Sequence, residues 1–116
     1  MKPNVLLFGW NRSVPGRESL SAKHFEEFVA FLTSQQQKGS FDRFEIVFLD
    51  PHGGDLNGFF LIHGAPAKLE AFTASEDWNK HIMRAILHLQ GVGVVGGLTG
   101  ASLMERMKLW TSLIPA

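Results

Sequence analysis

The chain has no cysteine and no tyrosine among its 116 residues, and no apolar run approaches the ~20 residues that a membrane-spanning helix needs. The absence of cysteine excludes disulfides, thiolate metal sites and cysteine nucleophiles. Neither charge predominates, since eleven Lys and Arg balance eleven Asp and Glu. The basic surface of a nucleic-acid-binding protein is therefore missing, and we expect neither nucleic acid nor a membrane as a partner.

The length fits one domain spanning residues 1–116, with a modest core. The apolar run Val5–Trp10 is shorter than the ~7 to 15 residues of a signal-peptide core, so we expect no export signal. A chain without cysteine is compatible with a reducing compartment. We therefore expect a cytoplasmic protein.

Aromatic residues are frequent but carry no hydroxyl, because ten Phe and three Trp occur without Tyr. Such rings bury a large apolar area without needing a hydrogen-bond partner for a hydroxyl. This composition favours an apolar cleft or interface.

Hydrophobic periodicity predicts four strands and three helical stretches. In the first helix, for example, Phe25, Phe28, Val29 and Leu32 follow a helical spacing, and Gly39 provides a stop. The expected strands are Val5–Trp10, Phe44–Leu49, Gly58–Gly64 and Val92–Val95, and the expected helices cover about 17–38, 66–89 with a break near 73–75, and 103–114.

This order, βαββαβ followed by one helix, predicts an α+β protein of the ferredoxin-like class, in which an antiparallel four-stranded sheet carries helices on one face. Val5–Trp10 and Phe59–Ile62 are apolar at both alternating positions, so both faces of the sheet need cover. We expect a second copy of the chain to supply it, forming a homodimer. The alternative is that the C-terminal helix covers this face within one chain.

The element order, the segment Gly53–Ile62 and the downstream pattern Leu69-x-x-Phe72-x-x-Ser75-Glu76-x-Trp78 resemble the dimeric α/β-barrel superfamily. That group includes antibiotic-biosynthesis monooxygenases, EthD-like proteins and YCII-related proteins. The resemblance implies a dimer with two facing sheets and, often, a small-molecule cleft between each sheet and its helices.

The monooxygenase branch implies an Asn near the end of the first strand, which Asn11 matches. Its Trp and His positions fall here at Phe72 and at Ile82, one residue from His81. The YCII-related branch favours a His-Asp pair, and no N-terminal histidine stands at its place. The resemblance therefore does not carry either activity over to this chain.

Two glycine motifs have structural interpretations. Gly91–Gly96 matches G-x-G-x-x-G but follows a helix and lies within an expected strand, which is the wrong context for a nucleotide site. His52-Gly53-Gly54 resembles an oxyanion loop, yet the chain has no G-x-S-x-G elbow and the segment reads as a turn. The histidine spacings match no recognised metal motif, so we expect no metal and no cofactor.

Histidines are the candidates for proton transfer. His63 stands on an otherwise apolar strand and is the first candidate for a general acid or base. His81, Arg84 and His88 share one helical face, which either faces a cleft or is a solvated surface, and the solvated surface is the favoured interpretation.

The sequence thus predicts a homodimer that binds a small, partly apolar ligand in a cleft between sheet and helices. One alternative is a cofactor-independent oxygenase or isomerase that uses His63 or His81, and another is a non-catalytic dimerisation or interaction module. The expected ligand-binding residues are Trp10, Asn11, Arg12, Phe48, Phe60, Phe72, Trp78 and Arg84, with Phe8 as a further wall.

Overall fold

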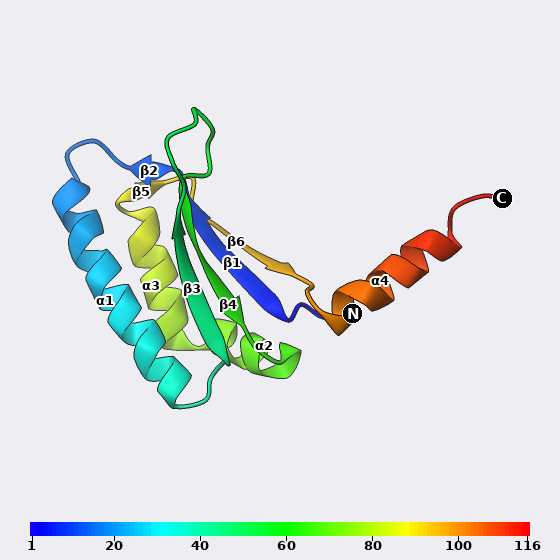
Figure 1. The fold of residues 1–116 in the computed structure, drawn as a ribbon. Coiled ribbons are helices and arrows are strands. Elements are labelled where there is room, and N and C mark those ends of the chain that lie inside the picture. Colours follow the sequence, from blue (N-terminus) through cyan, green and yellow to red (C-terminus); the bar gives the residue numbers. More distant parts are fainter.

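Four strands form one antiparallel sheet in the order β3-β4-β1-β6, and a separate pair, β2 and β5, extends it at one end (Figure 1). The structure is a computed structural model that describes residues 1–116. The strands are β1 (Val5–Trp10), β2 (Arg12–Ser13), β3 (Arg43–Phe48), β4 (Gly58–His63), β5 (Leu89–Gln90) and β6 (Gly93–Gly97). The helices are α1 (Glu18–Gln37), α2 (Pro66–Ala74), α3 (Glu76–Ile86) and α4 (Ala101–Ser112).

The expected α+β class and the antiparallel four-stranded sheet are confirmed. The predicted break in the second helical stretch is also present, because Ser75 lies between α2 and α3 and its hydroxyl accepts a hydrogen bond from the backbone N–H of Trp78. The sheet is open at both edges, so one chain does not form a closed barrel.

The second helical stretch ends earlier than predicted, and the prediction that it continues to Leu89 is wrong. The last turn tightens as the N–H groups of Leu87 and His88 bond to the carbonyls three residues before them. The chain then turns, and Leu89 and Gln90 pair with Ser13 and Arg12. A two-residue strand has too few positions to show a periodic pattern, so β2 and β5 left no signal in the sequence.

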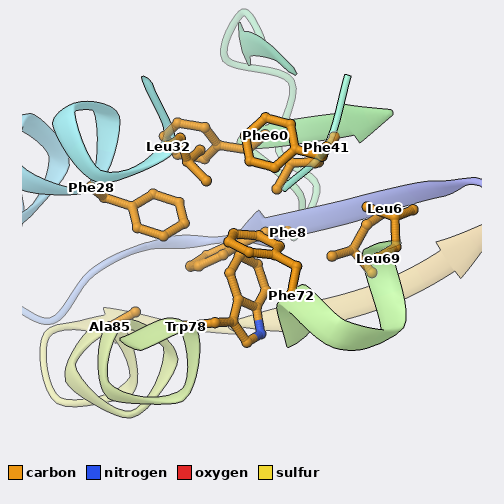
Figure 2. Packing of buried hydrophobic residues seen from close by; sticks show 11 residues of the cluster. Leu6, Phe8, Phe28, Leu32, Phe41, Phe60, Leu69, Phe72, Trp78 and Ala85 are labelled. Atoms are coloured by element: carbon orange, nitrogen blue, oxygen red, sulfur yellow. The ribbon is translucent and has the colours of Figure 1, made fainter. Parts of the chain in front are cut away.

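An aromatic core joins the helices to one face of the sheet (Figure 2). Phe28 of α1 is 3% exposed, and its ring centroid lies 4.9 Å from that of Phe60 and 5.3 Å from that of Phe8. Trp78 of α3 reaches the same group, 6.2 Å from Phe8 and 88° to it. These contacts hold the helix layer against β1 and β4 by apolar burial and edge-to-face ring packing.

The opposite face of the sheet has no helix over it. Helix α4 projects away from the rest of the chain and buries none of its residues (Figure 1). The alternative in which the C-terminal helix covers this face of its own sheet is therefore wrong. None of the helices combines the length and the apolarity needed to span a bilayer.

Two leucines of α1 provide a matched test of this packing. Leu32 is fully buried and Leu20 is 56% exposed on the same helix. We expect Leu32→Ala to lower the free energy of unfolding by about 2–5 kcal/mol and Leu20→Ala to change it by less than about 0.5 kcal/mol. Urea unfolding followed by circular dichroism measures both, and equal losses would contradict the assignment of α1's buried face.

Candidate functional site

A cavity of about 430 Å³ lies at the end of the molecule where β1 ends, α1 begins and α3 ends. Nine of its fourteen lining residues are hydrophobic, and the aromatic ones are Phe8, Trp10, Phe25, Phe28, Phe48 and Phe60. The side chains of Ser13, Ser21, His24, Glu26 and His88 form its polar part. An apolar chamber with a few polar groups on one side is the usual form of a small-molecule site.

Trp10 occupies its place in the cavity wall because its strand partner is a glycine. Gly58 pairs with Trp10 across β1 and β4, and a Cβ at residue 58 would lie 2.5 Å from the indole ring. The ring therefore lies directly over the backbone of β4. It meets Phe60 at 5.6 Å and the exposed Phe48 at 6.1 Å between ring centroids.

Three histidine rings form a hydrogen-bonded chain beside this wall. His24 Nδ1 lies 2.7 Å from His88 Nε2, and His24 Nε2 lies 3.0 Å from His81 Nδ1. At the inner end, His88 Nδ1 lies 2.8 Å from Ser21 Oγ, which accepts a hydrogen bond from Ser13 Oγ at 2.5 Å. We call the set Ser13, Ser21, His88, His24 and His81 the histidine chain.

Neutral imidazoles satisfy this geometry in two ways. Each neutral ring donates from one nitrogen and accepts at the other. In one arrangement His81 donates to His24, which donates to His88, which donates to Ser21. In the other, every one of these bonds is reversed. A proton entering at one end and leaving at the other converts the first arrangement into the second.

Burial keeps these rings neutral. It is the largest cause that lowers the pKa of His24 from 6.5 to about 4, and the positive charge of Arg84 lowers it further. The same two causes, burial first, lower the pKa values of His81 and His88. The rings are thus uncharged at neutral pH and can both donate and accept protons.

Two arginines form contacts between α1 and α3 near the histidine chain. Arg84 of α3 forms an ion pair with Glu27 of α1, and this hydrogen bond is the main reason why the pKa of Glu27 is lowered. The guanidinium of Arg17 donates to the carbonyl of Leu87 at the end of α3. Both contacts tie α1 to α3 on either side of the histidine chain.

The structure brings together three of the expected ligand-binding residues, since Trp10, Phe48 and Phe60 all line the cavity. Phe72 and Trp78 belong instead to the buried core, where their ring centroids are 5.0 Å apart. Neither contributes to the cavity wall.

Asn11 and Arg12 line a separate, largely polar hollow formed with the loop between β3 and β4. Asn57 donates to the side-chain oxygen of Asn11 at 2.7 Å, and Arg12 donates from Nε to Gln90 at 3.1 Å. These three consecutive residues, all expected to bind one ligand, therefore divide between two hollows, with Trp10 in the apolar cavity and the next two residues in the polar hollow.

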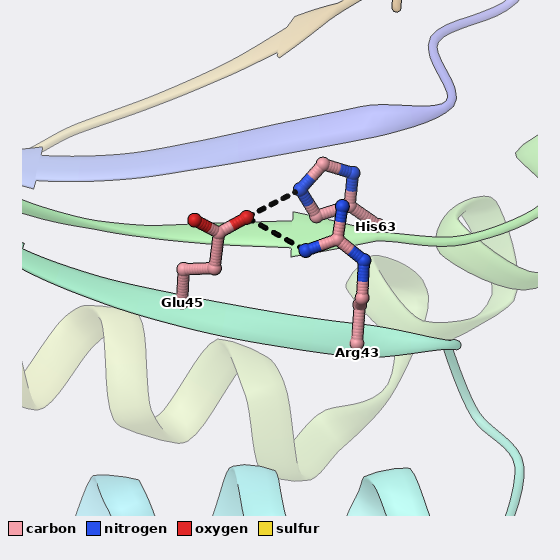
Figure 3. Close-up of polar contacts among 3 residues, drawn as sticks. All are labelled: Arg43, Glu45 and His63. Atoms are coloured by element: carbon pink, nitrogen blue, oxygen red, sulfur yellow. Dashed lines mark hydrogen bonds and ion pairs between the residues drawn. The ribbon is translucent and has the colours of Figure 1, made fainter. Parts of the chain in front are cut away.

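His63 lies on the face of the sheet that no helix covers (Figure 3). Its Nε2 is 3.2 Å from Glu45 Oε1, which also accepts a hydrogen bond from Arg43 at 2.7 Å. These two bonds, with that from Arg43 the larger effect, lower the pKa of Glu45. The sheet separates His63 from the cavity and from the histidine chain.

The favoured interpretation of the His81, Arg84 and His88 face as a solvated surface is wrong for His88, which is 4% exposed. Sequence reasoning also missed His24, although it lies four residues before Phe28 on the buried side of α1. That spacing was the available signal, since a histidine on an apolar face needs polar partners. No group of three or more His, Asp or Glu side chains is arranged to hold a metal ion.

The lowered histidine pKa values predict a loss of stability in mild acid. As the pH falls, unfolded histidines, with pKa near 6.5, take up protons at a higher pH than the folded ones do. The stability that depends on neutral histidines is therefore fully present above about pH 6.5 and is lost as the pH falls towards about 4. For each unit by which the pH falls in this window, the free energy of unfolding decreases by up to about 1.4 kcal/mol for every histidine that the fold keeps neutral. Urea unfolding across the window measures this slope. We expect His24→Gln to flatten the slope, and an unchanged slope would contradict a buried neutral His24.

Comparisons with protein-family models, with curated proteins and with solved structures find no match to this chain. The cavity and the histidine chain beside it are therefore the features from which a function can be inferred.

Proposed function

We propose that this protein binds a small, partly apolar molecule in the cavity between the sheet and α1. The observation that carries the proposal is the cavity itself, whose volume of about 430 Å³ falls within the ~300–1,000 Å³ of small-molecule sites. Phenylalanine and tryptophan rings supply the apolar walls, as expected for a ligand with an aromatic or aliphatic body.

The polar end of the cavity indicates what else the ligand carries. Both ring nitrogens of His24 and of His88 already have partners within the histidine chain. The serine hydroxyls retain further hydrogen-bonding capacity, because each has two lone pairs. A ligand hydroxyl group can donate to these lone pairs, and a ligand carbonyl can accept from Ser21 Oγ in the arrangement in which His88 donates to Ser21, so either group would connect to the histidines. Neutral rings and an apolar wall favour an uncharged ligand over an anion.

Proton transfer to or from this ligand is a second candidate function, supported by the histidine chain. Its two equivalent hydrogen-bond arrangements allow a proton to pass from the cavity side at Ser13 to His81 without a buried charge being left behind. Such a relay suits an isomerase or a cofactor-independent oxygenase that removes a proton from its substrate. His88 would be the proton acceptor nearest the cavity, acting through Ser21.

We further propose that the protein functions as a homodimer joined through the uncovered face of the sheet. Val5, Leu7, Phe59 and Leu61 on this face remain partly exposed in one chain. Packing against the same face of a second copy would remove this apolar area from water. The resemblance to the dimeric α/β-barrel superfamily supports the same assembly.

A cavity-blocking variant tests ligand binding. Ala22 and Ala30 are both exposed residues of α1, but only Ala22 lines the cavity. In a thermal-shift screen of small aromatic ketones, alcohols and quinones, a ligand present at 100 times its Kd would stabilise the protein by about 2.7 kcal/mol. We expect Ala22→Phe to abolish these shifts and Ala30→Phe to keep them. Equal shifts in both variants would place the ligand elsewhere, and a screen with no shifts would favour a purely interacting protein.

Incubation with the bound compound in D₂O, followed by mass spectrometry, tests proton-transfer chemistry, because a proton that is removed from the compound is replaced by deuterium. We expect His88→Gln to bind the compound within a few-fold of the original affinity but to lower its turnover by about 10²–10⁴-fold, as for loss of a general base. His63→Gln is the matched control, since the sheet separates His63 from the cavity. An equal loss in the control, or none in His88→Gln, would remove the histidine chain from the reaction.

A further inference from the structure

Apolar residues from all four strands adjoin one another on the uncovered sheet face, beside the Arg43, Glu45 and His63 group at one end. Register places Leu7 of β1 directly beside Leu61 of β4 on one side and Val95 of β6 on the other, and Phe59 beside Val47 of β3. Residues that pair directly across an antiparallel sheet lie on the same face. We call this surface the open face. Exposed patches of this kind are rare on monomeric proteins.

Helix α4 is the second unpartnered element. Three apolar residues repeat at helical spacing along it, and each is at least 41% exposed: Leu103, Met107 and Trp110. A helix of 12 residues without tertiary contacts is marginal in water. The apolar stripe of α4 therefore needs a surface that its own chain does not provide.

The base of α4 is held firmly although the helix itself is free. The Asn4 side chain accepts a hydrogen bond from the N–H of Thr99 at 2.9 Å and donates to its carbonyl at 3.0 Å. These two bonds tie the segment before α4 to the start of β1. The helix thus projects away from its own sheet, as Figure 1 shows.

The exposed area matches what a dimer would bury. One chain exposes 7471 Å², whereas a compact monomer of this mass exposes about 6,300 Å². Its radius of gyration is 16.1 Å, against about 13 Å for a compact chain of this length. If a dimer buried this excess area in both of its chains, it would remove about 2,300 Å² of surface from water, which lies within the range of obligate homodimer interfaces.

Charge on the open face favours a second copy over a charged partner. The charged residues of the open face are Arg43 and Glu45, which form an ion pair at one end of it, beside His63 (Figure 3). A surface that neutralises itself can meet its own copy without facing an unpaired charge.

We propose that α4 is an exchanged arm: in a dimer joined through the open faces, the α4 helix of each copy packs its apolar stripe on the other copy. This inference rests on the proposed homodimer and adds the partner's contact with α4. The arm would account for both the excess area and the folded state of an otherwise isolated helix.

Matched variants test the dimer and the role of α4 separately. Val95 lies on the open face and is 60% exposed, while its neighbour Val94 points to the helix side and is 40% exposed. We expect native mass spectrometry to find a dimer for the original chain and for Val94→Lys, but a monomer for Val95→Lys. We also expect Trp110→Glu to raise the dimer Kd at least about tenfold, as burial of a large apolar side chain implies, and Ser112→Glu on the opposite side of α4 to leave it unchanged.

Hydrogen exchange then reports on α4 directly. The α4 amides should be protected in the dimer and should exchange rapidly in monomeric Val95→Lys. A dimer with unprotected α4 amides would overturn the exchanged arm and leave the homodimer standing. Protected α4 amides in a monomer would show that the arm packs on its own chain, and a monomeric original chain would overturn both proposals without touching ligand binding in the cavity.

The absence of cysteine allows a final check that the contact is between copies. A spin label attached to Ser112→Cys on an unlabelled chain, mixed with isotopically labelled chain, broadens signals of the labelled copy only across the interface. We expect broadening confined to one surface of the partner. Its absence in a dimer would overturn the exchange of arms.

Discussion

The rest of the structure depends on one layer of aromatic side chains between the sheet and its helices. Phe28 alone meets Phe8, Phe60 and Trp78, which come from β1, β4 and α3. Because none of these rings carries a hydroxyl, the indole N–H of Trp78 is the one polar group among them, and the layer is held together mainly by packing. It sets the separation of α1 from the sheet, and that separation leaves a chamber near the start of α1.

Polar groups gather where this layer ends. His24 and His88 are buried at the edge of the aromatic packing, and each uses both ring nitrogens to satisfy the other members of the histidine chain. A buried imidazole without such partners would destabilise the fold. The histidine chain therefore stabilises the protein, and it also provides a row of groups that can transfer a proton. The same bonds that stabilise the neutral rings place them beside the only part of the cavity that offers hydroxyl groups.

Much of the fold could be predicted from the sequence because its signals are local and periodic. The spacing of Phe25, Phe28 and Leu32 gave α1, and Ser75 gave the break between α2 and α3. The site was less accessible because it depends on contacts between residues far apart in the chain. His24 and His88 are separated by 64 positions and meet only when α1 packs on α3. The otherwise apolar sequence of β4 made His63 conspicuous, but strand parity alone did not tell which of the two faces holds the helices.

The central claim is that a neutral, buried histidine chain borders an apolar cavity, and the most direct measurement is ¹⁵N NMR of the histidine side chains at about pH 5.5. The account predicts that His24, with its pKa lowered to about 4, still shows one protonated and one unprotonated ring nitrogen at this pH. A His24 ring with both nitrogens protonated there, titrating near the ordinary 6.5, would contradict the account, because a charged ring could not accept a hydrogen bond from either neighbour.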